Sequence, residues 1–302
     1  MKRFVTLTAA LVAAASFTAA APAADPVTPF PSPSVGEVFV AAQTVKADGS
    51  ASNYFAPGST VVFRAYGVDG KTHKLLTAKD VRYFYVTIPN QPNVKLHYDA
   101  KAPGATGRQA WTGTWTVPTA YPNGIVGFKV LAQAQSKRRG QFVQMPIATA
   151  QLTITATPPS APAGSVTPVA TTPPEKLDLS LYVDSINGSA PVAAPKRAVG
   201  CTQTNVYKRG EQFVLRSWGV NMADGQTLTA ENVDDAHYSV PGQPNVNLAW
   251  SAHGAATNRV WFWANFWNIP ADYPLGDTVV KVTFTADSGK TGTYEYPITI
   301  IP

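Results

Sequence analysis

Four histidines are the residues of this sequence best suited to proton transfer or metal binding: His73, His97, His237 and His253. They are far apart in the sequence, whereas a metal site usually draws its ligands from closely spaced positions on one element. The sequence also lacks a G-x-S-x-G nucleophile motif, an H-E-x-x-H zinc motif and a phosphate-binding glycine loop. Loop aspartates such as Asp69 and Asp287 offer at most a weak calcium site. We therefore expect no catalytic residue, no metal and no cofactor, and we predict that the protein is not an enzyme.

Tryptophans offer a different chemistry, the stacking and burial of large rings. A pair of them occurs at matching places in two parts of the chain, as Trp111 with Trp115 and as Trp263 with Trp267. Because side chains alternate across a strand, each pair points to one face of its strand. Recurrence of the pair favours a buried structural role over an exposed ladder of rings. The predicted structural core contains these four tryptophans together with Tyr121 and Tyr273.

The opposite face of the second tryptophan strand carries Phe262 and Phe266, where the first copy has Ala110 and Thr114. If the tryptophans face inward, these two rings face solvent, and an exposed apolar patch usually marks a contact surface. This face is therefore predicted to bind a protein partner or a second copy of the chain. The alternative is that a neighbouring strand, a loop or the linker covers both rings.

An arginine beside an aromatic ring occurs on one strand face in each copy, as Arg64 with Tyr66 and as Arg216 with Trp218. On a sheet surface such a pair can form a cation–π contact that contributes about 0.5–1 kcal/mol. Retention in both copies favours a structural role in which the arginine stem covers the sheet. These four residues are also predicted candidates for ligand binding.

Flat exposed aromatic rings would instead favour a carbohydrate or cell-wall polymer as the ligand. The candidates for this role are Tyr83, Tyr85, Trp218 and Trp261. Tyr83 and Tyr85 are expected to face outward near two basic or titratable residues of adjacent strands, Lys95 and His97. The second copy has a less basic and less aromatic set at the same positions, Asp235, His237, Asn247 and Ala249.

The elements that must hold these residues follow from an internal repeat. Residues 53–144 and 205–296 align without a gap at a constant offset of 152. Each copy shows apolar residues of period two, with proline or glycine turns after short segments and no long helical pattern. About seven short strands per copy are typical of an antiparallel two-sheet sandwich. The predicted fold class is all-β, with two tandem sandwiches joined by a proline-rich linker.

Residues 115–124, of pattern W-T-V-P-x-x-Y-P-x-G, lie before a strand and a hairpin that reaches Gly140, and residues 267–276 repeat the arrangement. This region resembles the late strands of bacterial immunoglobulin-like modules. The resemblance covers both copies and implies an immunoglobulin-like sandwich in an extracytoplasmic setting. Such modules serve as spacers, adhesins and enzyme-appended domains. The inter-sheet cysteine pair of antibody domains is absent, which places the chain with the bacterial versions.

The N-terminal segment and the segment between the two copies differ in composition from the copies themselves. A basic start, an alanine-rich apolar run and an A-x-A sequence ending at Ala23 are typical of a secretory signal. Stretches dense in proline without apolar periodicity are typical of extended linkers. The predicted organisation is a signal peptide (1–23), a proline-rich segment (24–35), a first domain (36–157), a linker (158–176) and a second domain (177–302). The processed protein is expected in the periplasm or outside the cell, and not to span a membrane.

Charge differs between the two copies. Residues 36–157 hold 13 Lys and Arg against 5 Asp and Glu, which gives +8, whereas residues 175–302 hold 9 against 12, which gives −3. The basic copy could attract an acidic partner, polymer or membrane surface, or pair head to tail with the acidic copy. The only cysteine, Cys201, matches Gly49 of the first copy, so no disulfide within the chain is expected and the thiol is not part of the shared framework.

From these features we predict an exported, non-enzymatic binding or assembly protein that contacts a protein partner, or a further copy of itself, through its sheet faces. Polysaccharide or cell-wall binding through exposed aromatic rings is the first alternative. A role as an accessory subunit of an extracytoplasmic enzyme is the second. Nucleic acid is not expected as a partner, because the sequence has no RNA-binding stacking motif.

Overall fold

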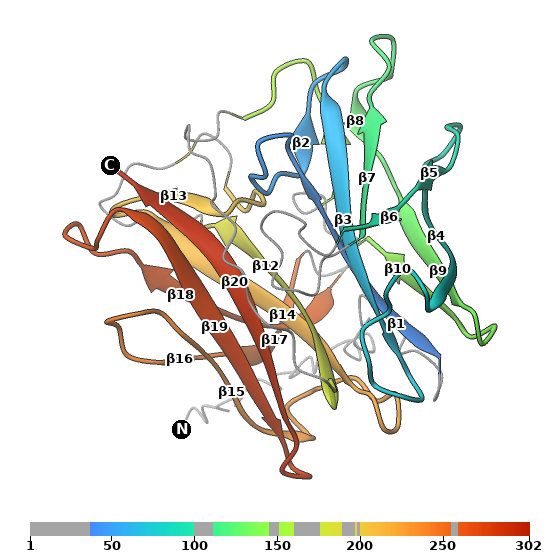
Figure 1. Ribbon diagram of the computed structural model, residues 1–302. Coiled ribbons are helices and arrows are strands. Elements are labelled where there is room, and N and C mark those ends of the chain that lie inside the picture. Colours follow the sequence, from blue (N-terminus) through green and yellow to red (C-terminus); the bar gives the residue numbers. More distant parts are fainter. Residues whose placement is uncertain are drawn as a thin grey trace, which may run out of the picture.

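The computed structural model describes residues 37–99, 111–144, 151–159, 176–188, 197, 200–254 and 259–302. Within these ranges the chain forms strands, turns and irregular segments, and no helix. The strands make five sheets, in which only the pairs β2–β11 and β13–β20 are parallel (Figure 1). The protein therefore has an all-β sandwich fold, as the apolar periodicity predicts, and it is consistent with the immunoglobulin-like sandwiches that the late-strand resemblance implies.

The predicted signal peptide (1–23), the proline-rich segment (24–35) and most of the linker (158–176) lie outside the described residues. These assignments, and the domain bounds 36–157 and 177–302, stay predictions.

Strands β1 to β11 form the first half of the chain. Two four-stranded sheets have the orders β1-β3-β7-β6 and β10-β9-β4-β5, and a small third sheet has the order β2-β11-β8. The bounds are β1 Val38–Val45, β2 Tyr54–Phe55, β3 Thr60–Asp69, β4 Val81–Thr87, β5 Val94–Lys95, β6 His97–Tyr98, β7 Trp111–Thr116, β8 Gly124–Ile125, β9 Lys129–Ala134, β10 Arg139–Val143 and β11 Thr153–Ile154.

Strands β12 to β20 form the second half. Its sheets have the orders β12-β14-β18-β17 and β13-β20-β19-β15-β16. The bounds are β12 Leu179–Asn187, β13 Val206–Lys208, β14 Gln212–Asn221, β15 Val233–Ser239, β16 Val246–Asn247, β17 Ala249–His253, β18 Val260–Asn268, β19 Gly276–Ala286 and β20 Thr291–Ile301.

The strand register repeats between the halves at the offset found in the sequence. Arg64 of β3 pairs with Thr112 of β7, and Arg216 of β14 pairs with Ala264 of β18, in each case 152 residues later. The repeat in sequence therefore coincides with a repeat in strand pairing.

One tryptophan of each half is held by the same hydrogen bond. The Trp111 indole N–H donates to the Leu76 carbonyl at 2.9 Å, and the Trp263 indole N–H donates to the Leu228 carbonyl at 2.8 Å. Both rings are buried, so the apolar surface is removed from water while the one polar group of each ring keeps a partner. These contacts tie β7 and β18 to the loops that precede β4 and β15.

The second tryptophan of each half packs edge to face against a tyrosine. Trp115 lies 5.2 Å from Tyr121 and Trp267 lies 5.0 Å from Tyr273, measured between ring centroids. Both tryptophans and Tyr273 are buried, whereas Tyr121 is half-buried. The tyrosine that follows the proline turn thus closes one end of each sandwich.

Segment 94–98, which its unbroken apolar–polar alternation predicts to be one strand, is divided between two sheets. Strand β5 pairs with β4, and β6 pairs with β7. Leu96 lies buried between them, and its N–H donates to the Phe84 carbonyl at 2.9 Å. The chain crosses here from one sheet to the other, because the buried leucine anchors the point at which it turns.

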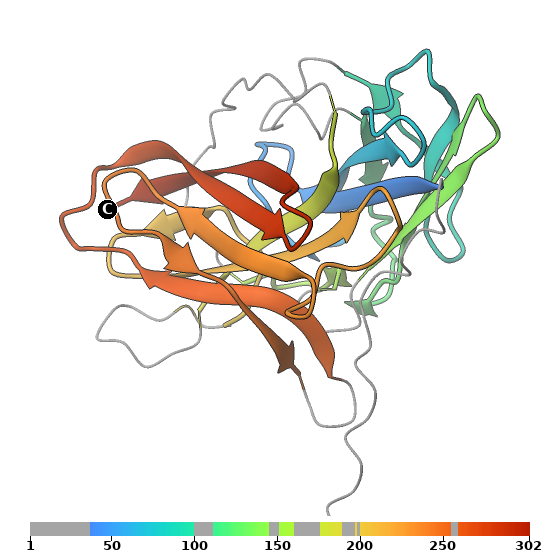
Figure 2. The ribbon, with the colours of Figure 1, turned by 90° about the horizontal axis from the view of Figure 1, so that it is seen from below.

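The two halves contact each other at their first strands, β1 and β12, which meet near the centre of the molecule in Figure 2. Every residue of β1 and every residue of β12 is buried. The Tyr66 hydroxyl donates to the Leu181 carbonyl across the boundary. Ring contacts add to this, with centroids 5.8 Å apart for Phe142 and Tyr182. A continuous buried cluster therefore runs from one half into the other.

Two asparagines form reciprocal hydrogen bonds at this boundary. The Gln203 backbone N–H donates to Asn53 Oδ1 at 3.0 Å, and the Ala51 backbone N–H donates to Asn205 Oδ1 at 2.8 Å. Positions 51 and 203, like 53 and 205, differ by the repeat offset of 152. Each half therefore gives the other the same contact that it receives, as in a two-fold symmetric interface.

Candidate binding surfaces

The paired arginines and aromatic rings lie inside the molecule. Arg64 and Arg216 are 6% and 2% exposed, and Tyr66 and Trp218 are buried as well. The expectation of an arginine–aromatic binding surface on these strands is therefore wrong. Alternation along a strand separates two faces, but it does not reveal that other parts of the chain cover the second face.

In the second half the buried arginine is paired with a buried carboxylate. Arg216 Nε donates to Asp184 Oδ1 at 2.7 Å, and Arg216 Nη2 donates to Asp184 Oδ2 at 2.6 Å. The Tyr182 hydroxyl also donates to Asp184 Oδ2, at 3.1 Å. Burial works against the charged guanidinium, but the adjacent Asp184 carboxylate outweighs it and raises the pKa of Arg216. This side-on pair satisfies a charge that would otherwise be costly to bury.

In the first half the corresponding arginine forms no ion pair with any residue that the structure describes. The residue opposite Arg64 on β1 is Gln43, at the place that Asp184 takes opposite Arg216 on β12. Arg64 Nε is buried without a hydrogen-bond partner. Burial lowers the pKa of Arg64, and the nearby Tyr294 only partly offsets this effect.

Phe262 is buried at 3% exposure, whereas Phe266 is 50% exposed. The expectation that both rings face solvent is therefore wrong for Phe262. The His253 ring stacks on it at 4.1 Å with an interplanar angle of 11°, and Trp218 lies 5.1 Å away. A neighbouring strand thus covers Phe262, and only Phe266 remains exposed on this face. Burial, followed by the charge of Arg216, lowers the pKa of His253.

The remaining tryptophan candidate, Trp261, is half-buried. Its ring centroid lies 6.1 Å from that of Trp250, and its backbone carbonyl accepts a hydrogen bond from the Trp218 indole at 3.1 Å. The ring is therefore packed on one side by another ring and is not a free platform.

Tyr83 and Tyr85 lie on one face of β4, and both are half-buried. Their ring centroids are 5.2 Å apart with an interplanar angle of 44°. Tyr85 pairs with Lys95 on β5, whose side chain is exposed, and with Leu131 on β9. These neighbours leave the two rings on an accessible face beside a cation.

The exposed basic side chains on the strands of this sheet are Arg82, Lys95, Lys129 and Arg139. At the two tyrosine positions the second half has Asp235 and His237, whose side chains contact each other at 2.7 Å. The tyrosine pair therefore belongs to the first half, whereas the basic character is shared in part, because the exposed Lys281 takes the position of Lys129 in the second half. We name the surface around Tyr83, Tyr85 and Lys95 the tyrosine face.

A groove of about 480 Å³ lies between the β3–β4 loop and the β9–β10 hairpin. Its charged lining residues are Asp69, Lys74, Lys79, Asp80 and Arg138. The Arg138 guanidinium forms an ion pair with Asp69. Burial raises the pKa of Asp69, but hydrogen bonds from Arg138 and two backbone N–H groups outweigh it, so the net shift is downward. These pairings hold the loop and the hairpin together.

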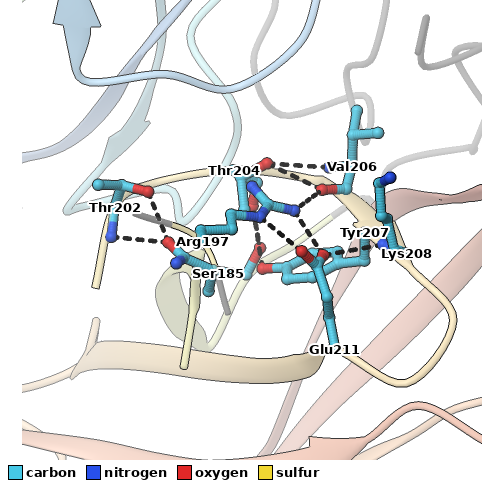
Figure 3. Close-up of polar contacts among 9 residues, drawn as sticks. Ser185, Arg197, Thr202, Thr204, Val206, Tyr207, Lys208 and Glu211 are labelled. Carbon is cyan, nitrogen blue, oxygen red and sulfur yellow. Dashed lines mark hydrogen bonds and ion pairs between the residues drawn. The ribbon is translucent and has the colours of Figure 1, made fainter. Parts of the chain in front are cut away.

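A second charged cluster stabilises the start of the second half (Figure 3). Arg197 Nε donates to Glu211 Oε1 at 2.9 Å, and Arg197 Nη2 donates to Glu211 Oε2 at 2.7 Å. Glu211 Oε2 also accepts the Lys208 backbone N–H at 2.8 Å, and the Arg197 guanidinium lies 5.5 Å from the Tyr207 ring centroid. Both carboxylate oxygens of Glu211 thus accept hydrogen bonds from residues of the preceding segment, so the cluster is a structural clamp.

Among the described residues, no group of three or more His, Cys, Asp or Glu side chains could hold a metal ion. The part of the chain that the structure describes also contains no helix able to cross a membrane. Cys201 has a free, half-buried thiol and a positive φ of 60°, and Gly49, its counterpart, has a φ of 88°. The shared left-handed conformation indicates that the turn, and not the thiol, is common to both halves.

Comparison with known proteins gives fold-level likeness only. No family model matches the chain, and no curated protein sequence matches it. Fibronectin(III)-like modules of CbhA from Clostridium thermocellum are 11% identical, with a TM-score of 0.23, over 87% of this chain and 94% of theirs. The SGBP-B protein of a Bacteroides ovatus glucan utilization locus, solved with a mixed-linkage heptasaccharide, is 13% identical, with a TM-score of 0.18, over 83% and 43%. The C-terminal domain of Streptococcus agalactiae BspA is 8% identical, with a TM-score of 0.20, over 86% and 100%.

Sequence reasoning missed the residues that join the halves, above all Asn53 and Asn205. Their signal was present in the sequence, because an asparagine recurs at the repeat offset outside a turn motif. Asp184 was also missed, because its place in the first copy is taken by Gln43 and the repeat alignment begins only at residue 53.

Proposed function

We propose that this protein is a non-enzymatic, exported binding protein whose tyrosine face binds an acidic polysaccharide. The observation that carries the proposal is the pair of half-buried rings, Tyr83 and Tyr85, beside the exposed Lys95 on an open sheet face. Tyrosine rings offer apolar area to a sugar ring while their hydroxyl groups hydrogen-bond.

Charge supports an acidic ligand. Residues 36–157 carry a net charge of +8 from 13 basic and 5 acidic side chains. A field of this sign raises the local concentration of a polyanion and speeds its binding. Export follows from the signal-like sequence at 1–23, and a location in the periplasm or outside the cell is part of the proposal.

Affinity electrophoresis in gels that contain polygalacturonate tests this function, with dextran as the neutral polymer. The wild-type protein should be retarded by polygalacturonate, and less so at higher salt because screening weakens charge attraction. Changing both Tyr83 and Tyr85 to alanine should weaken binding at least roughly tenfold, equivalent to about 1.4 kcal/mol.

The second half provides a matched control. Alanine at Asp235 and His237, the positions that correspond to the two tyrosines, should leave retardation unchanged. Equal loss in both double variants, or no retardation of the wild type by either polymer, would refute the proposal.

A protein partner at Phe266 is the second candidate, because this ring is 50% exposed on β18. With Phe262 buried, the apolar patch is reduced to a single large ring and its half-buried neighbour Val214. Phe266→Ser should abolish co-purification of such a partner from the native envelope, and persistence of that complex would exclude this surface.

A further inference from the structure

The two halves bury corresponding arginines but differ in what neutralises them. Arg216 uses its Nε–Nη2 edge to bind both oxygens of Asp184. Arg64, at the same place in the first half, is 6% exposed, and its Nε has no hydrogen-bond partner. An isolated buried charge is strongly unfavourable unless a partner of opposite sign satisfies it.

In the described part of the first half, an uncharged residue stands where the second half has Asp184. Gln43 pairs with Arg64 in the same register that joins Asp184 to Arg216. The glutamine side chain is uncharged, so it cannot neutralise the guanidinium. Among the residues that the structure describes, Tyr294 from the other half is the group that partly offsets the effect of burial on the pKa of Arg64.

Space beside Arg64 is left by a glycine. A side-chain carbon added to Gly49 would meet Arg64 Nη2 at 3.4 Å and no other atom within 4 Å. The corresponding residue of the second half is Cys201, so a side chain occupies this position beside the arginine that is already paired. The first half therefore combines an Arg64 Nε that has no hydrogen-bond partner with an open position next to the adjacent Nη2.

We propose that the Nε–Nη2 edge of Arg64 is a binding site for a small carboxylate anion of about the size of formate, which takes the place that Asp184 fills in the second half. A carboxylate matches this edge because its two oxygens accept two parallel N–H bonds. The low exposure of Arg64 selects a small anion over a sugar acid. This site is separate from the tyrosine face, and its existence does not depend on polysaccharide binding.

Nitrogen-15 NMR of the arginine side chains tests the proposal on the intact processed protein. Sodium formate is added to chloride-free buffer, up to roughly 0.1 M, where the Debye length is still about 10 Å. The Arg64 Nε resonance should shift and saturate. The Arg216 Nε resonance is the internal control and should not move, because Asp184 already fills its edge.

Gln43→Asp provides the matched variant, since it builds into the first half the carboxylate that the second half has. It should remove the response of Arg64 to formate and raise the unfolding temperature in formate-free buffer. Glucuronate should cause no shift at the same concentrations. The proposal would be overturned if formate left the Arg64 Nε chemical shift of the wild type unchanged. It would also be overturned if formate caused the same shift in Gln43→Asp as in the wild type. The wild-type measurement decides the matter even if the variant does not fold.

Discussion

The reciprocal asparagines at the boundary between the halves give a quantitative prediction. Asn205→Ala removes the acceptor of the Ala51 N–H, which is 2.8 Å away, and leaves that buried amide without a partner. Asn53→Ala removes the acceptor of the Gln203 N–H at 3.0 Å and also the bond from Asn53 Nδ2 to the Gln151 carbonyl at 3.1 Å.

A buried donor or acceptor left unpaired costs about 1–3 kcal/mol. We therefore expect the free energy of unfolding to fall by about 2 kcal/mol for each variant, because each leaves one buried backbone N–H without its acceptor. The Gln151 carbonyl still accepts the Thr153 hydroxyl at 3.0 Å in Asn53→Ala, so it is not left unpaired. Urea unfolding followed by tryptophan fluorescence measures both values. Asn93→Ala, a substitution in an exposed turn, is the control and should change stability by less than about 0.5 kcal/mol.

The opposite result would be a free energy of unfolding within about 0.5 kcal/mol of the wild-type value for both boundary variants, which is the usual range for surface substitutions. Such a result would mean that the halves do not form these contacts in solution. A large cost for one variant alone would contradict the reciprocity of the interface.

Three further predictions concern single side chains. Phe262→Ser should lower the free energy of unfolding by about 3–5 kcal/mol, as for other large buried rings. Phe266→Ser should change the free energy of unfolding by less than about 0.5 kcal/mol. Equal effects in urea unfolding would contradict the different burial of the two rings. Arg197→Met should cost about 3 kcal/mol because it leaves the Glu211 carboxylate buried and unpaired, and a neutral result in thermal unfolding would show that water reaches this carboxylate. The lowered pKa of His253 means that the unfolded state takes up its proton more readily, so stability should fall as the pH drops below about 6.5. His253→Gln should remove that part of the pH dependence of the urea midpoint, and an unchanged slope would argue against it.

The fold class was predictable from sequence because each strand is short, alternates in polarity and ends at proline or glycine. The tryptophans also carried a clear signal, since two pairs recur on one strand face and lie buried in both halves. Segment 94–98 was expected as a single strand because its alternation is unbroken. Only the tertiary structure shows that Leu96 is the point where the chain changes sheets.

The outward faces were much less predictable. Arg64 and Tyr66 stand on the face opposite the core of their own sandwich, and their polarity and size are compatible with a binding surface. They are buried because the other half of the chain approaches, as the bond from Tyr66 to the Leu181 carbonyl shows. An alternating sequence pattern distinguishes the two faces of a strand. It does not predict which face the other sandwich covers, because that depends on how the two sandwiches pack together.

The buried first strands, β1 and β12, also bear on how this chain can be cut or shortened. A fragment that ended between the halves would lose the part of the cover that the other half contributes to its first strand, of which every residue is buried in the intact molecule. Bare strand edges with apolar side chains are templates for uncontrolled sheet extension. Each half therefore acts as the other's protective cover, and a truncated product would be prone to aggregate even if its own sandwich were sound.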